Sequence, residues 1–252
     1  MLREQTSHPP VTPRPIAVVT GATGGIGSAI ALALAGQGMQ VCVLGRNKDR
    51  LSCVANRISQ FSDASSYAVD LTVESELQSL FHYLNDQFGR VDILVHAAGV
   101  MRQDRMESAK VEEFDLQYMV NVRAPYALTK HLLPLLIAAR GQIVFINSTV
   151  GLSAKRQEIG QYAATKQALK GIADSLREEL NPQGIRVLSV FVGRTATPMQ
   201  EEVCRRENKV YRPETLIQPE DIASVVVNTI LLPPTVEVID VALRPMKNPN
   251  AA

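Results

Sequence analysis

The sequence lacks the patterns that disulfide-stabilised and metal-binding proteins need. Its three cysteines, Cys42, Cys53 and Cys204, are widely spaced and odd in number. They form neither a disulfide framework nor a metal cluster, so reduced thiols are expected. The four histidines are scattered, and neither an HExxH nor a CxxC pattern occurs. The sequence therefore predicts no metal site.

An excess of one charge sign and a long apolar run are also missing. The chain has 26 basic and 25 acidic residues, a formal net charge of +1, which creates no field for nucleic acid or an anionic membrane. No apolar run approaches membrane-spanning length, and the proline-rich start MLREQTSHPPVTPRP has no apolar core of signal-peptide length. We expect a cytoplasmic protein that binds neither nucleic acid nor a membrane.

The rest of the sequence alternates short apolar runs with helical patterns. These runs are continuously apolar, as in strands of a parallel sheet covered by helices on both faces. The sequence predicts a single α/β domain with a doubly wound, mostly parallel, seven-stranded sheet. The expected strands are 16–20, 41–44, 66–69, 92–96, 142–147, 185–191 and 237–241, and the expected helices are 26–34, 48–58, 73–88, 111–139, 162–180 and 219–231.

The domain is expected to span residues 14–246, because no internal repeat, low-complexity segment or charged linker divides the chain. Residues 1–13 and 247–252 are expected to be flexible tails. The stretch 193–215 is the longest connection without a predicted element. Long connections of this kind are often functional, so we interpret it as a candidate substrate lid.

A glycine cluster follows the first expected strand and opens the first expected helix. Glycines in this context allow a tight turn and close approach of the backbone to a pyrophosphate, which the helix N-terminus also attracts. No Gly-Lys-Ser/Thr follows, which excludes a P-loop. The expected phosphate cradle consists of Gly21, Thr23, Gly24, Gly25, Ile26 and Gly27. Its spacing resembles the TGxxxGxG pattern of the short-chain dehydrogenase/reductase family, which has a Rossmann-type fold, and the resemblance covers about residues 15–245.

The end of the second expected strand predicts the cofactor. NAD enzymes of this fold place a carboxylate there to bind the ribose 2′-hydroxyl. Here the sequence is Leu44-Gly45-Arg46-Asn47, without an acid. Arg46 can bind a 2′-phosphate, although it can also be a solvated surface residue. We expect NADP(H) rather than NAD(H). The pair Asp70 and Leu71 resembles residues that line the adenine in the family, but Asp70 is equally compatible with a helix cap.

Two Tyr-x-x-x-Lys patterns occur, at Tyr126/Lys130 and at Tyr162/Lys166. Residues four apart on a helix share a face. Only Tyr162 opens a helix after a strand that ends in a serine, Ser148, so Tyr126 and Lys130 are interpreted as ordinary helix residues. A nearby ammonium favours phenolate, so Lys166 is expected to lower the pKa of Tyr162.

The resemblance implies roles for four residues. In the family, the tyrosine (here Tyr162) exchanges a proton with the carbonyl or alcohol oxygen, and the serine (Ser148) holds that oxygen. The lysine (Lys166) lies near the nicotinamide ribose, and the helix asparagine (Asn121) positions a water in a proton relay. Taken singly, Ser148 is also compatible with a strand-end cap and Asn121 with an ordinary polar helix residue.

The chain departs from the family pattern in two places. The family's Asn-x-Ala-Gly is His96-Ala97-Ala98-Gly99 here, and the family's Pro-Gly is Val192-Gly193. A structural role for His96 in the sheet is favoured over catalysis, while the backbone from His96 through Ala98 and Gly99 can still line the cofactor. Gly193 still allows close approach to the nicotinamide, and Thr195 and Thr197 match positions that contact the carboxamide and the phosphate.

These observations predict an NADP(H)-dependent oxidoreductase that transfers hydride to or from a small carbonyl or alcohol. A catalytically silent NADPH-binding sensor of the same fold is the alternative. A serine hydrolase is excluded, because no Gly-x-Ser-x-Gly elbow is present. The substrate pocket is expected to be apolar, and the resemblance implies a homodimer or homotetramer. The predicted pocket residues are Met101, Met106, Leu152, Ile159 and Met199.

Overall fold

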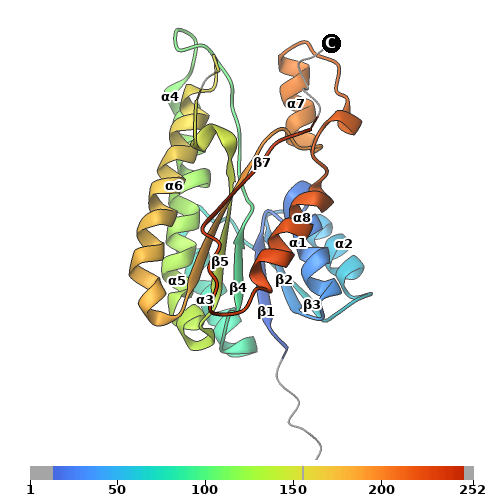
Figure 1. The fold of residues 1–252 in the computed structure, drawn as a ribbon, viewed down its shortest axis with the longest axis vertical. Helices are drawn as coiled ribbons and strands as arrows, with labels where there is room; N and C mark the ends of the chain where they lie inside the picture. Colours follow the sequence, from blue (N-terminus) through green and yellow to red (C-terminus); the bar gives the residue numbers. More distant parts are fainter. Residues whose placement is uncertain (1–13, 155, 247–252) are drawn as a thin grey trace, which may run out of the picture.

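The structure, a computed structural model, describes residues 14–154 and 156–246. The predicted flexible tails 1–13 and 247–252 lie outside the described residues. Within these residues the chain forms one α/β domain with a single parallel sheet between two layers of helices (Figure 1). This architecture confirms the predicted fold class. No helix in the described part of the chain has both the length and the apolar character to cross a membrane.

The sheet has the strand order β3-β2-β1-β4-β5-β6-β7, and every pair of neighbours is parallel. The chain reverses its direction of progress across the sheet between β1 and β4, the kind of switch point where α/β proteins bind ligands. The strands are β1 Ile16–Thr20, β2 Gln40–Gly45, β3 Ala64–Ala68, β4 Ile93–His96, β5 Gln142–Ser148, β6 Arg186–Val192 and β7 Asp240–Leu243.

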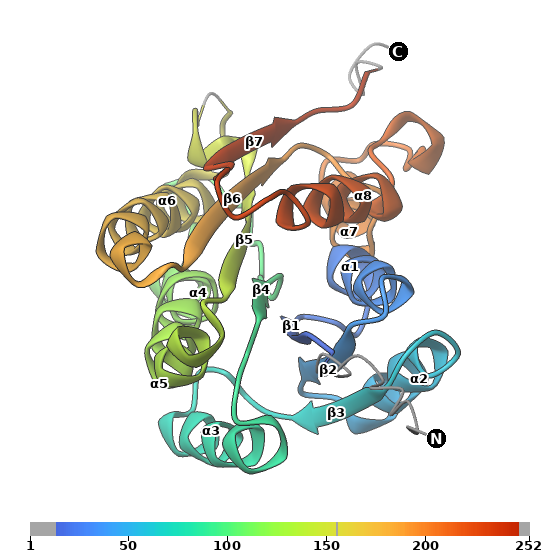
Figure 2. The same ribbon diagram turned by 60° about the horizontal axis from the view of Figure 1, so that its bottom comes forward.

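Helices cover both faces of the sheet (Figure 2). One layer comprises α1 Gly25–Gly36, α2 Lys48–Ile58 and α8 Pro219–Ile230, and the other comprises α3 Glu74–Phe88, α4 Val111–Tyr118, α5 Ala124–Ala139 and α6 Gly160–Leu180. Successive strand residues point to opposite faces. Val18 therefore packs with α3 and α5, whereas Val19 packs with α1 and α8.

The predicted helix 111–139 is interrupted in its middle. α4 passes into a π-helical turn at Met119–Arg123 before α5 begins. Such a turn inserts an extra residue and often occurs at functional sites. Here it contains the buried Asn121. The apolar periodicity predicted the helix but not the turn, because a local change in hydrogen bonding leaves the hydrophobic pattern almost unchanged.

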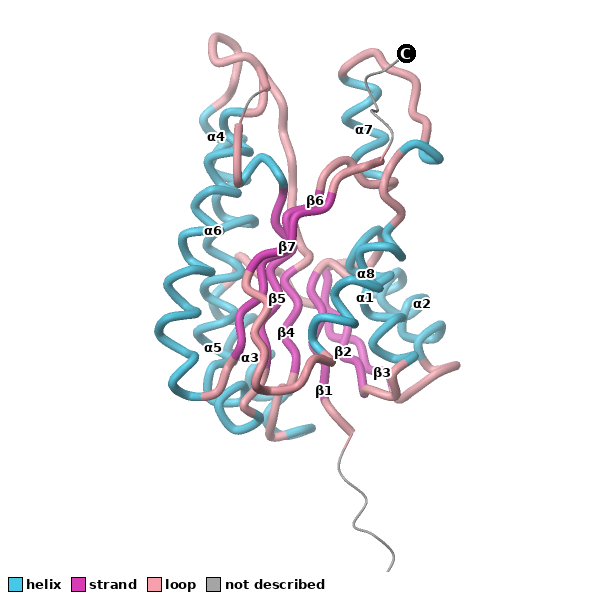
Figure 3. The backbone as a smooth tube through the Cα atoms, in the orientation of Figure 1, coloured by secondary structure: helices cyan, strands magenta, loops and turns pink. Residues whose placement is uncertain are grey.

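The stretch 193–215 contains a helix, α7 Pro198–Arg206, that the sequence analysis left unassigned. Thr197 caps it by accepting a hydrogen bond from the Gln200 backbone N–H at 3.2 Å, and Pro198 occupies its first position. A threonine cap followed by proline was a signal for this helix. α7 stands beyond the carboxyl ends of the strands (Figure 3).

Candidate active site

The loop after β1 and the first turn of α1 are each packed too tightly for a side chain at one of their glycines. Gly21 has a φ of +64°, and a Cβ there would lie 2.7 Å from the Ala98 backbone after β4. A Cβ at Gly27 would lie 2.5 Å from the Gly21 carbonyl oxygen. The loop therefore lies directly against the end of β4, and α1 lies directly against the loop.

Gly24 serves a different purpose, because it borders open space. It is the N-cap of α1 and offers no side chain to the first backbone N–H groups. A Cβ there would meet nothing within 4 Å, so it would project into the space in front of the helix. Unpaired N–H groups at a helix N-terminus bind phosphate well. These residues fit the pyrophosphate of a dinucleotide.

A groove of about 570 Å³ extends from this loop across the carboxyl ends of β1, β2 and β4. It brings together most of the residues expected to bind the cofactor. They are Gly21, Thr23, Gly24, Gly25, Ile26, Gly27, Arg46, Asp70, Leu71, Ala98, Gly99 and Thr197.

Two arginines line the groove beside the end of β2. Arg46 was expected there, but Arg50 of α2 was missed. Arg50 lies four residues later, and Asn47 fixes its backbone by accepting its N–H at 2.9 Å. The spacing of the two arginines was the available signal. No acid directly follows β2, so both guanidiniums are available at this end of the groove.

Asp70 is neither the cap of α3 nor a freely pointing carboxylate. Val73 is the N-cap of α3 and has no side-chain cap. Asp70 Oδ1 instead accepts hydrogen bonds from the Thr72 hydroxyl at 2.7 Å and the Thr72 N–H at 2.9 Å. These bonds lower the pKa of Asp70, with a further contribution from Arg46. The carboxylate therefore shapes the turn that borders the groove.

A second cavity, of about 160 Å³, adjoins the groove; we call it the catalytic cavity. Ser148 reaches it from the end of β5, and Tyr162 and Lys166 reach it from the first turns of α6. Gly193, Thr195 and Thr197 line it after β6. The groove and the catalytic cavity share Ile26 and the segment Ala97–Gly99, so a dinucleotide in the first can reach the second.

The environment of Tyr162 differs from the sequence expectation. Lys166 Nζ lies 5.8 Å from the centre of the tyrosine ring. Burial raises the pKa of Tyr162 to about 12, and the neighbouring Ser148 offsets only part of this effect. The expected lowering by Lys166 is therefore wrong for the chain by itself: burial of the phenolate dominates, and the lowering contribution comes from Ser148.

Lys166 is itself buried, and burial lowers its pKa to about 8. Its ammonium donates a hydrogen bond to the Ile146 carbonyl at 3.1 Å, and its own carbonyl accepts one from Asn147 Nδ2 at 3.1 Å. These contacts join the start of α6 to β5. Lys166 therefore titrates close to neutral pH.

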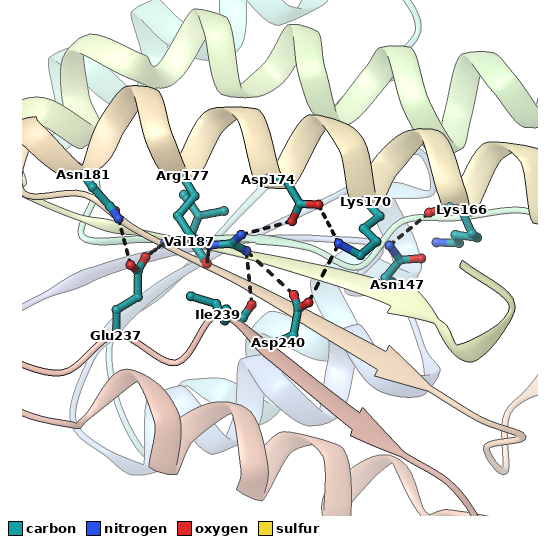
Figure 4. A network of polar contacts seen from close by, with 10 residues as sticks. All are labelled: Asn147, Lys166, Lys170, Asp174, Arg177, Asn181, Val187, Glu237, Ile239 and Asp240. Atoms are coloured by element: carbon teal, nitrogen blue, oxygen red, sulfur yellow. Dashed lines mark hydrogen bonds and ion pairs between the residues drawn. The ribbon is translucent and has the colours of Figure 1, made fainter. Parts of the chain in front are cut away.

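A polar network centred on the buried Arg177 holds the rest of α6 against the sheet (Figure 4). Arg177 donates to the carbonyls of Val187 at 3.1 Å and Ile239 at 3.2 Å. It also pairs with Asp174 on its own helix at 3.0 Å and lies 3.8 Å from Asp240 of β7. The helix that carries Tyr162 and Lys166 is thereby fixed to the last two strands.

Asn121 is buried in the π-helical turn, where its side chain bridges two segments. Oδ1 accepts the Val100 N–H at 2.9 Å, and Nδ2 donates to the Val100 carbonyl at 2.8 Å and the Thr165 hydroxyl at 3.1 Å. A Cβ at Gly99 would lie 3.4 Å from Asn121 Oδ1 and 3.9 Å from Lys166 Nζ. The amide and the ammonium thus border the same small space.

The second Tyr-x-x-x-Lys pair lies outside this site. Tyr126 is 51% exposed and Lys130 is exposed, and neither lines the groove or the catalytic cavity. Their separation from the site agrees with the interpretation as ordinary helix residues.

His96 lies inside the sheet layer rather than in the groove. Its ring stacks on Phe145 at 4.8 Å, and its Nε2 is 2.8 Å from the Thr129 hydroxyl. Burial lowers the pKa of His96 to about 3, so the ring is neutral at ordinary pH. The side chain takes the structural position that the sequence favoured. A contact between its backbone and a cofactor stays a prediction.

The expected apolar pocket forms only in part. Met101 and Met199 line the catalytic cavity. Met106 is instead 94% exposed, Leu152 is largely exposed and Ile159 is buried without lining the cavity. A position just after a strand was not a sufficient criterion for predicting pocket residues, because loops also turn side chains toward the solvent. Sequence reasoning missed several lining residues: Thr149, Val150, Arg156, Arg194, Gln200 and Val203.

Across the described ranges, no three His, Cys, Asp or Glu side chains cluster in a way that could hold a metal ion.

Comparisons with known proteins match this geometry. A family model described as short chain dehydrogenase matches residues 15–208. An uncharacterized oxidoreductase from Staphylococcus epidermidis is 33% identical over 232 residues, covering 92% of this chain and 97% of the relative.

Solved structures agree. An alcohol dehydrogenase from Thermococcus sibiricus, complexed with 5-hydroxy-NADP, superposes with a TM-score of 0.85 at 28% identity, covering 94% of this chain and 99% of that one. An NAD⁺-bound xylitol dehydrogenase shares the fold with a TM-score of 0.84 at 22% identity, covering 92% and 98%. The chain belongs to the short-chain dehydrogenase/reductase family and is an oxidoreductase that uses a nicotinamide dinucleotide.

Proposed function

We propose that this enzyme uses NADP(H) to reduce a small, largely apolar carbonyl compound, or to oxidise the corresponding alcohol, with Tyr162 as general acid/base. The observation that carries the proposal is the catalytic cavity, where Ser148, Tyr162 and Lys166 meet beside the dinucleotide groove. The bound cofactor supplies or accepts the hydride, and the protein supplies orientation and a proton.

Tyr162 is the proton donor in the reductive direction. Because its pKa is about 12 in the chain alone, the phenol is protonated at neutral pH and has a proton to give. Ser148, at the end of β5, can hold the same carbonyl oxygen by a hydrogen bond and so polarise it. Both residues are only 9% exposed, and polar interactions are stronger in such a partly dehydrated site.

Lys166 and Asn121 replace the proton that Tyr162 gives away. Lys166 has a pKa of about 8, so both of its protonation states are accessible near neutral pH. Asn121 Oδ1 borders the same space as Lys166 Nζ around Gly99. A water held there would connect the lysine to the solvent side of the site.

The preference for NADP(H) rests on Arg46 and Arg50, which line the groove beside β2 where no acid directly follows the strand. A guanidinium binds phosphate with several donors. The relative from Thermococcus sibiricus was solved with an NADP derivative.

The Arg46→Asp variant tests this preference. We expect the ratio of kcat/KM for NADPH to that for NADH to fall by about 10- to 100-fold, since one charge-assisted contact is lost and a repulsion is added. Lys48→Asp is the matched control, because Lys48, at the start of α2, is exposed and does not line the groove. An unchanged ratio in Arg46→Asp would refute the assignment.

The segment 193–215 is proposed to act as the substrate lid. Its helix α7 contributes Met199, Gln200 and Val203 to the catalytic cavity. These side chains cover the cavity from beyond the strand ends, opposite the start of α6. A lid in this position would select the substrate and exclude water.

A homodimer or homotetramer is proposed from the family resemblance, through the helices that bear Asn121 and Tyr162. Leu116, Tyr118, Tyr126 and Ile137 are large apolar side chains exposed on α4 and α5. Light scattering coupled to size-exclusion chromatography tests this assembly, and a monomer at micromolar concentration would contradict it.

A further inference from the structure

The catalytic cavity has an uneven distribution of charge. Three cationic side chains line it, those of Arg156, Lys166 and Arg194. Among the described residues that line it, none is acidic. The whole chain has nearly equal numbers of basic and acidic residues, so this local excess does not follow from a generally basic composition.

Arg194 is held rigidly close to the catalytic serine. Val192 of β6 is the register partner of Ser148 of β5, and Arg194 follows two residues later. The Arg194 carbonyl accepts the Ile217 N–H at 3.2 Å, and Thr195 forms a parallel bridge to Ile217. The backbone therefore projects this guanidinium from a fixed point, and its side chain is only 14% exposed.

Glu207, just past the end of α7, is the shared counter-ion of this cluster. Arg194 Nη2 lies 2.9 Å and 3.1 Å from its two oxygens, Lys209 Nζ lies 3.0 Å away, and Arg156 also pairs with it. Burial raises the pKa of Glu207, but hydrogen bonds from Lys209 and Arg194 outweigh this and lower it to about 2. Glu207 is therefore always ionised, and three cations share its single negative charge.

The cluster has unused binding capacity. Arg194 uses only Nη2 on Glu207, and no described residue accepts a hydrogen bond from its Nε or Nη1. An arginine whose only role is to pair with Glu207 would not need these additional hydrogen-bond donors to face a cavity. On the same helix, Glu202 pairs with Arg205 and Arg206 on the exposed surface, where water solvates the remaining donors. Inside the catalytic cavity, a bound ligand can accept hydrogen bonds from the remaining donors of Arg194, whose side chain is 14% exposed.

We propose that the substrate carries an anionic group, a carboxylate or a phosphate, in addition to its carbonyl, and that Arg194 with Arg156 binds this group. The inference rests on the proposed reduction at Tyr162 and names the substrate class of that site. Met101 and Met199 contact the apolar part of the molecule, while the two guanidiniums select its charged end.

The decisive experiment compares matched charged and neutral substrates. Straight-chain oxo acids of increasing length are assayed with NADPH, each beside its methyl ester, and dihydroxyacetone phosphate is assayed beside dihydroxyacetone. We expect kcat/KM to be about 10- to 100-fold higher for the anionic member of at least one pair, because a charge-assisted hydrogen bond contributes this much. The acid series and the phosphate pair show which anion is preferred.

The Arg194→Gln variant should remove most of this preference, because it should lower kcat/KM far more for the anionic member of a pair than for the neutral member. Arg194→Lys, which keeps the charge, should recover part of it and also shows that the site still folds. Arg205→Gln is the matched control, since it removes a positive charge from α7 outside the cavity. The dissociation constant of NADPH, measured by fluorescence, should be the same in all these variants.

The outcomes separate this inference from the proposed function. If esters are reduced as well as acids, the enzyme is a reductase without an anion site. If Arg194→Gln weakens NADPH binding instead of the charge preference, the arginine belongs to the cofactor site and the inference is wrong. If no carbonyl is reduced, the proposed function fails. Calorimetry of butyrate against butyramide on the NADPH complex then still decides the anion site, and equal affinities would exclude it.

Discussion

The same Tyr-x-x-x-Lys motif occurs on two neighbouring helices, but its tyrosine is exposed on one helix and buried on the other. Tyr126 and Lys130 on α5 have the spacing of Tyr162 and Lys166 on α6, and in both pairs the two side chains share a helix face. Tyr126 is exposed and lines neither the groove nor the catalytic cavity, whereas Tyr162 is 9% exposed and lines the catalytic cavity. The spacing alone therefore does not make a catalytic pair.

The difference arises from what precedes each helix. β5 is followed by the short turn Thr149–Gly151, which packs so closely against α6 that a Cβ at Gly151 would lie 2.9 Å from the Lys166 carbonyl oxygen. This close approach turns the first residues of α6 over the carboxyl edge of the sheet. α5 instead continues from the π-helical turn, and Tyr126 in its first turn faces outward.

The largest expected difference between the two pairs is in turnover. Tyr162→Phe should lower kcat by about 100- to 10,000-fold, the usual contribution of a general acid, with NADPH affinity retained. Tyr126→Phe should leave kcat unchanged. Steady-state oxidation of NADPH measures the first effect and fluorescence titration the second. Comparable activity in the two variants would remove the distinction between the helices.

The two lysines should differ by a smaller factor. Lys166→Met should reduce kcat/KM by about 10- to 100-fold, since a charge-assisted contact is lost. It should not lower the free energy of unfolding at neutral pH, because a buried ammonium is replaced by an apolar side chain of similar length. Lys130→Met should change neither quantity. Chemical denaturation beside the kinetic assay checks both, and a strongly destabilised Lys166→Met would contradict the assigned burial cost.

The smallest effect is a dependence of stability on pH. Lys166 releases its proton near pH 8 when folded and near 10.5 when unfolded. Between these values the unfolded chain binds more protons, so the stability of the wild type rises with pH. Relative to Lys166→Met, the free energy of unfolding of the wild type should rise by at most about 1.4 kcal/mol per pH unit between these two pKa values. This gain is lost as the pH falls back through about 8.

Urea unfolding at a series of pH values measures this difference, and taking Lys166→Met as reference cancels the titration of Tyr162. A flat difference for Lys166 across the window would show that its ammonium is not desolvated.

Local sequence patterns predicted the elements well where short-range chemistry decides the structure. α2 was predicted with its observed bounds, because Asn47 caps it and Leu51, Val54 and Ile58 form one buried stripe. The glycine loop was also predictable, since only glycine accommodates its turns and close contacts. β7 was predicted about three residues too early, because Val236 and Ile239 are apolar yet exposed before the strand.

The candidate site was predictable in its motif residues but not in its charge. Arg156 and Arg194 lie 38 positions apart in the sequence, and nothing in either local pattern indicates that both reach the cavity beside Tyr162. Their common partner Glu207 follows a helix that was itself missed. The contribution of such loop residues to the site depends on where the ends of the strands place them.

The sequence by itself determined the alternating strands and helices, the phosphate-binding turn and the candidate tyrosine, because these depend on side-chain periodicity and on backbone conformations that few residue types allow. Only the tertiary structure decided which Tyr-x-x-x-Lys pair is buried, how far desolvation shifts the pKa values of Tyr162 and Lys166, and which arginines face the substrate. Burial and electrostatic environment are properties of residues brought together from distant positions, and no local pattern contains them.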